Sequence, residues 1–575
     1  MLETTLNTDY VPGTNLSGGF ASADWRFLLP SLKFKNFLCL GAPSTSSLPV
    51  LSTMGGSVFV VSKNLTKLRK FGQECQNRQI INVKIVYAKS FATLPFANDS
   101  IDLIYNAQRK NDVVFFRKKN IVAEISRLLS PGGVIYCETK GLANYQSVNN
   151  LVNSGLETGH IFWLTPFAGT VRTALPLSDR EIADYFFTNV MYGRSFKKRT
   201  FSKLGRVLSK TGLLSHVSPR RAVLVQHAEM NGSTTEPPEY LMSIAEDAGL
   251  DLTNYRFGLS TRGQGNSNKA IFYLFNKTEK LPDTVIKMTR SSEFNYRLEN
   301  EYRVLVELKK QLFVGQHTFP EPLFLSYHNG LAVLGMRAIQ GDAFRKRTQA
   351  NENCPIAHDA LDWIVELGSK SANNTAISAS EASDKLHRLF ERFNEIYQLT
   401  SEHKDFLDQQ IASIALSKNG FPLVLQHGDP GTWNILVSDK NRVIFIDWEA
   451  GEPKGMPLWD LFYFFRTYAS WVSRMQGSRD SIKNFTDQFL KPSRLSGLFQ
   501  EVTARYCLRI NLDRSLVAPL YYTCWMHRAL KEATRLTNDG LESGHYVNIL
   551  RLTIEQRKTS ETLKQFLSLD GNGFE

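Results

Sequence analysis

Three polar residues between positions 423 and 449, in LVLQHGDPGTWNILVSDKNRVIFIDWE, have types and spacing that suit phosphoryl transfer from a nucleotide. Asp429 ends a His-Gly-Asp triplet, Asn434 follows five positions later, and Asp447 follows after thirteen more. A carboxylate at Asp429 could orient an acceptor hydroxyl and take its proton. Carboxylate and amide oxygens at Asp447 and Asn434 are hard ligands of the kind that Mg²⁺ prefers beside a triphosphate.

The residues between Asn434 and Asp447 predict how these groups come together. Two short apolar runs, 435–437 and 443–446, flank a polar turn at 438–442, which is the pattern of a β-hairpin. Such a hairpin would carry Asp447 back beside Asn434. The competing interpretation is an aspartate-capped turn and hairpin without a catalytic role.

This stretch resembles the catalytic and metal loops of protein kinases. The aminoglycoside phosphotransferase and choline kinase family is closer, because it carries His-Gly-Asp or His-Asn-Asp, four residues, Asn, and then Asp-Trp or Asp-Phe with Glu. The resemblance implies an α+β two-lobed kinase-like domain that uses ATP and Mg²⁺. It implies that Asp429 is the catalytic base and that Asn434 and Asp447 hold the metal. It also implies that Asp460 and His427 brace the catalytic loop.

A lysine and a glutamate upstream match the other half of such a site. Residues 284–287 form a predicted strand that ends in Lys287, which resembles the small-lobe lysine that grips the α- and β-phosphates. The segment 294–312 is a predicted helix, and on it Glu301 is our candidate for the carboxylate that pairs with Lys287. Glu299 is the nearest competitor, and a surface salt bridge is the alternative role for both.

Two glycines, Gly263 and Gly265, lie in a polar stretch before the predicted strand 270–275. Glycines there would let backbone amides approach nucleotide phosphates, and a plain hairpin turn is an equal interpretation. Further on, residues 335–341 resemble the hinge that holds the adenine edge in this family. We therefore count both glycines as nucleotide-binding candidates.

The first part of the chain has the pattern of a different fold. Short apolar runs alternate with helical segments, and this order predicts an α/β doubly wound sheet. The predicted strands are 37–40, 58–61, 83–87, 101–105 and 134–136, and the predicted helices are 65–75 and 120–129. Residues 94–105 (LPFANDSIDLIY) and 124–136 (EISRLLSPGGVIY) resemble two motifs of class I S-adenosylmethionine-dependent methyltransferases. The resemblance covers roughly residues 31–145.

The sequence departs from that family where the cofactor would bind. Cys39 stands where the first strand normally ends in an acid, and Pro43 stands where the next turn needs a glycine with an amide donor. Ser62 and Lys63 replace the acid that holds the ribose, and Ser90 replaces another acid. We therefore expect this domain to have lost S-adenosylmethionine and to act as a scaffold or to bind another ligand.

Composition narrows the class of protein. The chain has 575 residues, 42% hydrophobic and 21% charged, so we expect a globular protein of two or three domains. No apolar run approaches the ~18 residues of a membrane span. Six scattered cysteines without a Cys-x-x-Cys pair favour a cytoplasmic location. The net charge of +13 suits a protein that binds an anionic nucleotide and does not by itself indicate nucleic acid.

The segment 194–221 concentrates Lys and Arg and lacks acids. A solvated face is the ordinary explanation of such a run, and binding to an anionic polymer, nucleotide or membrane surface is the alternative. We expect no nucleic-acid partner, because Phe196 and Phe201 are the only Phe, Tyr or Trp residues in it.

Four segments follow from these patterns. We predict a loosely ordered lead-in at 1–30, a methyltransferase-like domain at 31–228, a linker at 229–240 and a kinase-like domain at 241–575. The linker is the polar stretch NGSTTEPPE and its surroundings.

Together the patterns predict an ATP-dependent phosphotransferase that acts on a hydroxyl of a small molecule or sugar. A bifunctional enzyme that also methylates its substrate is the first alternative. A nucleotide-binding pseudoenzyme scaffold is the second, and the intact Asp429, Asn434, Asp447 and Lys287 argue against it.

Overall fold

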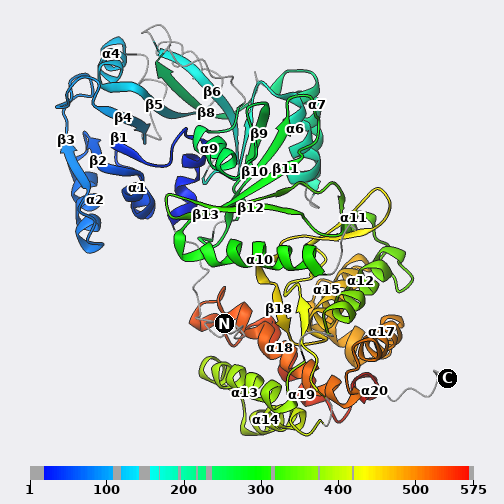
Figure 1. Cartoon of the computed structure of the whole chain (residues 1–575). Helices are drawn as coiled ribbons and strands as arrows, with labels where there is room; N and C mark the ends of the chain where they lie inside the picture. Colours follow the sequence, from blue (N-terminus) through cyan, green and yellow to red (C-terminus); the bar gives the residue numbers. More distant parts are fainter. Residues whose placement is uncertain are drawn as a thin grey trace. The chain divides into compact units, whose positions relative to one another are not determined.

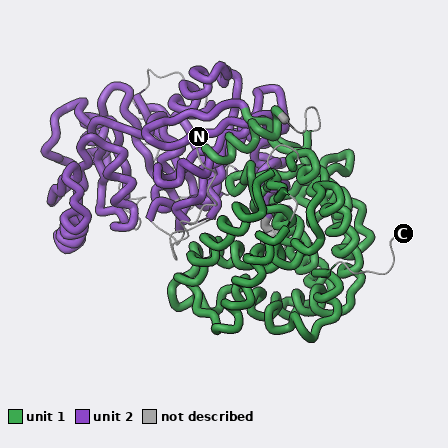
Figure 2. Tube along the Cα trace, turned by 60° about the horizontal axis from the view of Figure 1, so that its bottom comes forward, with its two compact units in different colours: residues 1–16, 299–322, 339–575 green, residues 17–298, 323–338 purple. Residues whose placement is uncertain are grey.

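The computed structural model describes residues 19–107, 118–140, 156–166, 169–191, 196–214, 218–227, 236–263, 265–311, 317–372, 376–417 and 420–568. These residues fall into two compact units, coloured separately in Figure 2. Unit 2 spans residues 17–298 and 323–338, and unit 1 contains residues 299–322 and 339–575. The boundary between the units lies inside the predicted kinase-like domain.

Unit 2 is built on strands that join into one sheet (Figure 1). The strands are β1 (Phe34–Leu40), β2 (Gly55–Ser62), β3 (Val83–Tyr87), β4 (Ile101–Asn106), β5 (Leu129–Lys140), β6 (Leu156–Thr165), β7 (Thr173–Pro176), β8 (Arg220–His227), β9 (Tyr255–Ser260), β10 (Lys269–Asn276), β11 (Thr284–Thr289), β12 (Pro322–His328) and β13 (Leu331–Arg337). Their order across the sheet is β12-β13-β11-β10-β9-β7-β6-β8-β5-β4-β1-β2-β3.

The methyltransferase-like part of the sheet is mostly parallel. β1 pairs in parallel with β2 and β4, β2 with β3, and β4 with β5, whereas β8 runs antiparallel to β5. Its helices include α1 (Leu48–Met54), α2 (Leu65–Asn77) and α4 (Lys119–Leu128). Phe37 and Cys39 share a buried cluster with α1 and α2, while Leu38 and Leu40 share one with α4, as strand alternation requires. Helices on both faces confirm the predicted doubly wound α/β fold.

The predicted small lobe is the antiparallel part of the same sheet. β9, β10, β11 and β13 pair antiparallel in that order. β7 pairs with β9, where Ala174 lies opposite Leu259, so the two parts are one continuous sheet. Phe37 of β1 and Phe272 of β10 belong to one buried cluster. The two predicted domains therefore share both a sheet and a core within unit 2.

Most of the predicted linker 229–240 lies outside the described residues. Its end leads into α9 (Glu239–Asp247), where Tyr240 is buried in the same cluster as β1 and β10. The Tyr240 amide donates to the carbonyl of Pro30 at 3.1 Å, and its hydroxyl donates to the carbonyl of Phe27 at 3.1 Å. This helix is therefore packed against the N-terminal part of the chain.

The predicted lead-in is corrected in its second half, while residues 1–18 lie outside the described residues. Gly19–Leu28 form the 3-10 helix η1, and Asp24 and Phe27 in it have no exposed surface. We expected loose order because the stretch contains many glycines and serines. The segment is instead buried, because Trp25 and Phe27 supply enough apolar surface to pack it into the core.

The basic segment 194–221 is only partly a surface feature, and its residues 194–195 and 215–217 lie outside the described residues. It contains the helix α7 (Phe196–Lys210). Arg220 at its end is buried and forms an ion pair with Glu138 at 2.7 Å. This arginine acts within the fold rather than as part of a solvated face.

Unit 1 is mainly helical, as the large lobe of a kinase-like fold requires. Its longer helices are α10 (Asn295–Gln311), which begins in unit 2, α12 (Pro355–Ala372), α13 (Ala379–Ile396), α14 (Ser401–Ile414), α15 (Trp459–Met475), α17 (Arg494–Ile510), α18 (Val517–Ala533), α19 (His545–Gln556) and α20 (Glu561–Ser568). Short strands β15 (Val424–Gln426), β16 (Ile435–Val437), β17 (Val443–Phe445) and β18 (Glu452–Gly455) lie among them. Across the described ranges, no helix is both long and apolar enough to cross a membrane.

Candidate active site

The hairpin predicted after Asn434 is present in unit 1. β16 and β17 pair antiparallel, with Ile435 opposite Phe445. The Ile446 amide donates to the carbonyl of Asn434 at 2.9 Å, so the chain returns to Asn434 one residue before Asp447. Asp447 itself has φ 68° and ψ 65°, a left-handed conformation that costs free energy for a residue other than glycine and is often found at functional sites.

Asp429 and Asn434 are in direct contact. The side-chain nitrogen of Asn434 donates to the Asp429 carbonyl at 2.9 Å and to its Oδ2 at 3.1 Å. Because the nitrogen faces Asp429, the side-chain oxygen of Asn434 is the atom left for a metal. One amide oxygen and the Asp447 carboxylate fit Mg²⁺, which usually keeps waters and phosphate oxygens as its other ligands. Across the described ranges, no group of three or more His, Cys, Asp or Glu residues is placed to hold a metal ion.

Asp460, at the start of α15, braces the catalytic loop as expected. Its carboxylate accepts hydrogen bonds from the amides of His427 at 2.6 Å and Gly428 at 3.0 Å. Gly428 has φ 74°, and a Cβ on it would lie 1.9 Å from the carbonyl oxygen of Ala450. The loop therefore needs glycine before Asp429, which explains the His-Gly-Asp triplet.

His427 has the predicted bracing position. It is fully buried, its Nε2 lies 3.0 Å from the Ile446 carbonyl, and its Nδ1 accepts from the Asp429 amide at 3.3 Å. These partners assign the proton of a neutral ring to Nε2. Burial lowers the pKa of His427 to about 4, which favours the neutral ring at physiological pH.

Arg528 on α18 is a site residue that the sequence did not reveal. Its Nη2 lies 3.2 Å from Oδ1 of Asp429, and its Nη1 donates to the Gly428 carbonyl at 2.8 Å. The guanidinium carbon lies 3.5 Å from the ring centre of Tyr463, and Lys531, one turn later, reaches the Gly428 carbonyl at 3.4 Å. The sequence signal that could have indicated this role is the presence of two cations, Arg528 and Lys531, one turn apart on a helix whose other residues are mostly apolar and buried.

Glu301 is better placed than Glu299 to act inside the fold. Glu301 is fully buried, whereas Glu299 is partly exposed. Oε1 of Glu301 accepts from the Trp448 amide at 3.3 Å, directly after Asp447. Lys287 is 9% exposed on β11. Lys287 belongs to unit 2 and Glu301 to unit 1, so their pairing stays a prediction.

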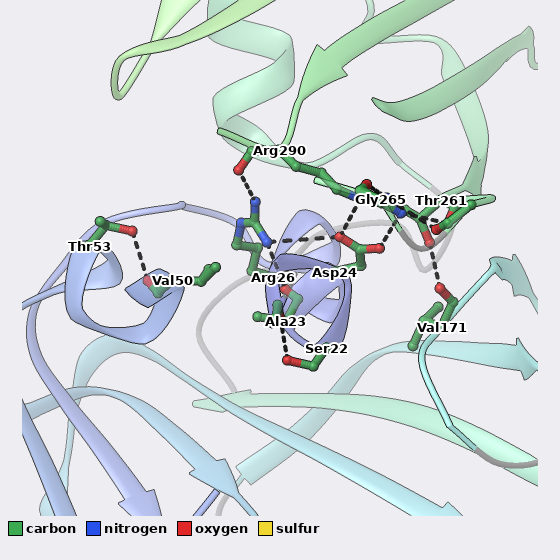
Figure 3. Close-up of polar contacts among 12 residues, drawn as sticks. Ser22, Ala23, Asp24, Arg26, Val50, Thr53, Val171, Thr261, Gly265 and Arg290 are labelled. Atoms are coloured by element: carbon green, nitrogen blue, oxygen red, sulfur yellow. Dashed lines mark hydrogen bonds and ion pairs between the residues drawn. The ribbon is translucent and has the colours of Figure 1, made fainter. Parts of the chain in front are cut away.

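Gly263 and Gly265 lie between β9 and β10 of unit 2. Figure 3 shows Gly265 beside the buried side chain of Arg290. Nη1 of Arg290 donates to the carbonyl of Gly263 at 3.1 Å and to that of Gly265 at 2.9 Å. Gly263 has φ 90°, and the Asn268 side chain would lie 2.4 Å from a Cβ there. At least this glycine is required by the turn itself.

The end of β1, where the methyltransferase family places its cofactor, has a different character. Cys39 is fully buried, and burial raises the pKa of its thiol well above the usual value. Lys63, after β2, places its ammonium 5.1 Å from the ring centre of Phe91. Neither side chain can replace a carboxylate that accepts ribose hydrogen bonds. These residues do not fit S-adenosylmethionine in the usual way.

Trp25 of η1 packs on the same region of the sheet. Its ring stacks on Tyr105 at 4.3 Å between centroids and on Tyr136 at 4.6 Å. Tyr105 is next to last in β4, and it pairs with Cys39 of β1. An aromatic side chain of the chain itself therefore covers part of the sheet near the ends of β1 and β4.

Comparison with known proteins identifies two domains that match the two resemblances seen in the sequence. The model of the phosphotransferase enzyme family matches residues 259–483, and the model of a methyltransferase domain matches residues 38–137. No curated protein matches the chain.

Solved structures of both kinds are similar to parts of the chain. The aminoglycoside phosphotransferase APH(3'')-Id from Streptomyces rimosus is 16% identical, covers 52% of this chain and 97% of its own, and has a TM-score of 0.31. A methyltransferase dependent on S-adenosylmethionine from Aquifex aeolicus is 15% identical, covers 24% of this chain and 87% of its own, and has a TM-score of 0.21.

The fold and the family models agree on the arrangement. Strands β1 to β5 fall within or across residues 38–137, and the catalytic loop falls within residues 259–483. The chain therefore joins a methyltransferase domain to a domain of the phosphotransferase enzyme family.

Proposed function

We propose that the chain transfers the γ-phosphoryl group of ATP to a hydroxyl of a small molecule or sugar. The observation that carries this proposal is the arrangement of Asp429, Asn434 and Asp447 on one loop and hairpin of unit 1. Asn434 holds the Asp429 carboxylate through its nitrogen, and Asp447 follows the strand that returns to Asn434.

Asp429 orients the acceptor hydroxyl and takes its proton as the new oxygen–phosphorus bond forms and the bond to the leaving diphosphate breaks. When bound, Mg·ATP supplies the phosphoryl group, and the metal neutralises charge on the triphosphate. Asn434 and Asp447 hold that metal through oxygen atoms. Lys287 binds the phosphates, with Glu301 as its partner.

Arg528 has a positioning role in this scheme. It holds Oδ1 of Asp429 at 3.2 Å, while Asn434 holds Oδ2 from the other side. Fixing both carboxylate oxygens limits rotation of the side chain, and a fixed base reacts faster than one that must be oriented at each turnover.

We propose further that the methyltransferase domain works without S-adenosylmethionine. Buried Cys39 and exposed Lys63 support this, because neither is an acid able to hold the cofactor. The domain then contributes its sheet and core to the phosphotransferase half.

Binding of Mg·ATP tests the main proposal. We expect Mg·ATP to raise the Tm of the wild type, by an amount equivalent to about 2.7 kcal/mol at a concentration one hundred times Kd. The variant Asp447→Ala should show the response to ATP without its dependence on Mg²⁺. Exposed Asp439, at the tip of the hairpin, gives the matched control Asp439→Ala, which should respond as the wild type does. A wild type that shows no metal-dependent stabilisation would overturn the proposal.

A further inference from the structure

A buried ion pair connects η1 with Arg290, which directly follows β11, the strand that carries Lys287. Nε of Arg290 lies 3.0 Å from Oδ1 of Asp24, and Nη2 lies 2.6 Å from Oδ2 (Figure 3). Both side chains have no exposed surface. Arg26 adds a second link, because its Nη2 donates to the carbonyl of Arg290 at 2.8 Å. The N-terminal segment therefore binds Arg290 through both its side chain and its backbone.

The remaining donors of Arg290 bind the backbone of the glycine-containing turn. Nη2 donates to the carbonyl of Thr261 at 2.7 Å, and Nη1 donates to those of Gly263 and Gly265 at 3.1 and 2.9 Å. A guanidinium has five N–H donors, and these three bonds with the two to Asp24 use all five. Arg290 is therefore fixed in one orientation, with Asp24 on one side and the turn on the other.

This contact sets the electrostatics of the turn. Three carbonyl oxygens at alternate positions point toward a cation, so the negative ends of these peptide dipoles face inward. A phosphate is repelled by carbonyl oxygens and attracted by amides, and turning the carbonyls inward removes the repulsive groups from the outer side. Asp24, Arg26 and Arg290 together leave one net positive charge beneath the turn, which also favours an anion.

The start of the turn is anchored in the methyltransferase domain as well. The Thr261 amide donates to the carbonyl of Arg172 at 2.8 Å, and its hydroxyl donates to the carbonyl of Val171 at 2.8 Å. Both partners lie just before β7. The turn thus has contacts to two separate segments outside the phosphotransferase family match.

We propose that Arg290, held by Asp24, is a positioning residue that orients Thr261, Gly263 and Gly265 of this turn for binding of nucleotide phosphates. The inference rests on the proposed phosphotransferase function. It means that η1, which precedes the methyltransferase strands, completes the nucleotide-binding lobe. A phosphotransferase half without residues 19–28 lacks the carboxylate that fixes Arg290.

Nucleotide affinity tests the proposal on the full chain. We expect Asp24→Asn and Arg290→Lys each to weaken Mg·ATP binding at least tenfold by calorimetry and to raise KM for ATP more than they lower kcat. The matched control is Asp179→Asn, because Asp179 forms a similarly buried pair with Arg256 of β9 at 2.7 Å and does not touch the turn. This control should bind Mg·ATP as the wild type does.

A second pair of measurements separates positioning from loss of stability. The double variant Asp24→Leu/Arg290→Met replaces the ion pair by apolar groups, which often preserves stability. Its affinity for nucleotide should nevertheless stay below that of the wild type, because the turn has lost Arg290. Without nucleotide, hydrogen exchange at amides 261–263 and 265–268 should rise at least tenfold in Asp24→Asn and stay unchanged in the control.

The outcomes distinguish this inference from the proposed function. A wild type that fails to bind Mg·ATP overturns the proposed function and the nucleotide role of Arg290 with it. A wild type that binds, beside an Asp24→Asn variant with equal affinity and equal exchange in the turn, overturns the inference alone. Equal losses in Asp24→Asn and Asp179→Asn also overturn it, because they would report a general weakening of the sheet.

Discussion

The catalytic loop of unit 1 and the cofactor end of the methyltransferase sheet face a similar task, since each belongs to a fold that holds an adenosine-containing ligand. In the first, several polar groups hold one another: Asn434 contacts Asp429, Asp460 accepts from the loop amides, and Arg528 pairs with Asp429. In the second, Cys39 is buried and Lys63 lies over a phenylalanine ring. A core can thus hold a methyltransferase fold together although the side chains at this end are not the acids that the resemblance implies.

The strongest way to break this comparison is to remove the base. Asp429→Asn should lower phosphoryl transfer by ~10²–10⁴-fold, because the amide cannot accept the hydroxyl proton. Binding of Mg·ATP should stay nearly intact, since our proposal assigns the metal to Asn434 and Asp447. The measurement is ADP formation with a panel of sugars and small alcohols, beside calorimetry with Mg·ATP. A variant that turns over at the rate of the wild type would show that Asp429 is not the base.

Calorimetry with S-adenosylmethionine examines the other region. Two lost charged hydrogen bonds, at roughly 1.5–3 kcal/mol each, weaken a micromolar site by about two to four orders of magnitude. We therefore expect no binding at tens of micromolar by the full chain, while Mg·ATP binds to the same sample. Binding of S-adenosylmethionine in that range would remove the contrast between the two regions and favour a bifunctional enzyme.

Acid should destabilise the catalytic loop through His427. Its pKa in the folded state is about 4, below an ordinary value near 6.5, because burial disfavours the charged ring. The folded state therefore binds fewer protons than the unfolded state between pH 6.5 and 4, and the free energy of unfolding falls as pH falls through that window. The full shift corresponds to about 3 kcal/mol.

The variant His427→Gln isolates this contribution. Burial raises the pKa of Asp460 to about 7, which acts in the opposite sense and is present in both proteins. Chemical unfolding at pH 7 and pH 4 should show a larger loss of stability in the wild type than in the variant. Equal losses would mean that His427 is charged when folded.

Removing the charge of Arg528 should give the smallest effect on activity among these changes, and it tests whether the contact with Asp429 contributes to catalysis. Arg528→Met keeps the volume of the side chain and loses a charged contact to Asp429, so we expect kcat to fall about tenfold to a hundredfold with Mg·ATP affinity unchanged. Arg557→Met is the matched control, because Arg557 also pairs with a carboxylate and lies over an aromatic ring, Phe406. A normal kcat in Arg528→Met would make its contact with Asp429 purely structural.

The local sequence pattern predicted the strands, helices and hairpin well, because the alternation of apolar and polar residues and the spacing of motif residues depend only on neighbours in the chain. The strand at Val83–Tyr87 and the hairpin around residues 435–446 are found where they were expected. The spacing of Asp429 and Asn434 was enough to place them together, since five residues of one loop cannot separate far.

The missed contacts join residues that are far apart in the chain. Asp24 and Arg290 are separated by 266 positions, and Arg528 and Asp429 by 99. Trp25 and Phe27 indicate that the segment around Asp24 is buried, but no neighbouring residue indicates that Arg290 is the partner of its carboxylate. The continuous sheet was missed for the same reason, because pairing of β7 with β9 depends on which strand edges the two folds leave open.

The pairing of β7 with β9 has a consequence for any attempt to study the halves separately. A cut at residues 229–240 would leave β7 and β9 as two unprotected sheet edges, and such edges promote pairing between copies and aggregation. It would also divide one apolar core between two fragments. Natural selection meets the same constraint, because a substitution that loosens the methyltransferase strands also loosens the phosphotransferase sheet. That dependence is a reason for the chain to retain a methyltransferase fold whether or not it binds a cofactor.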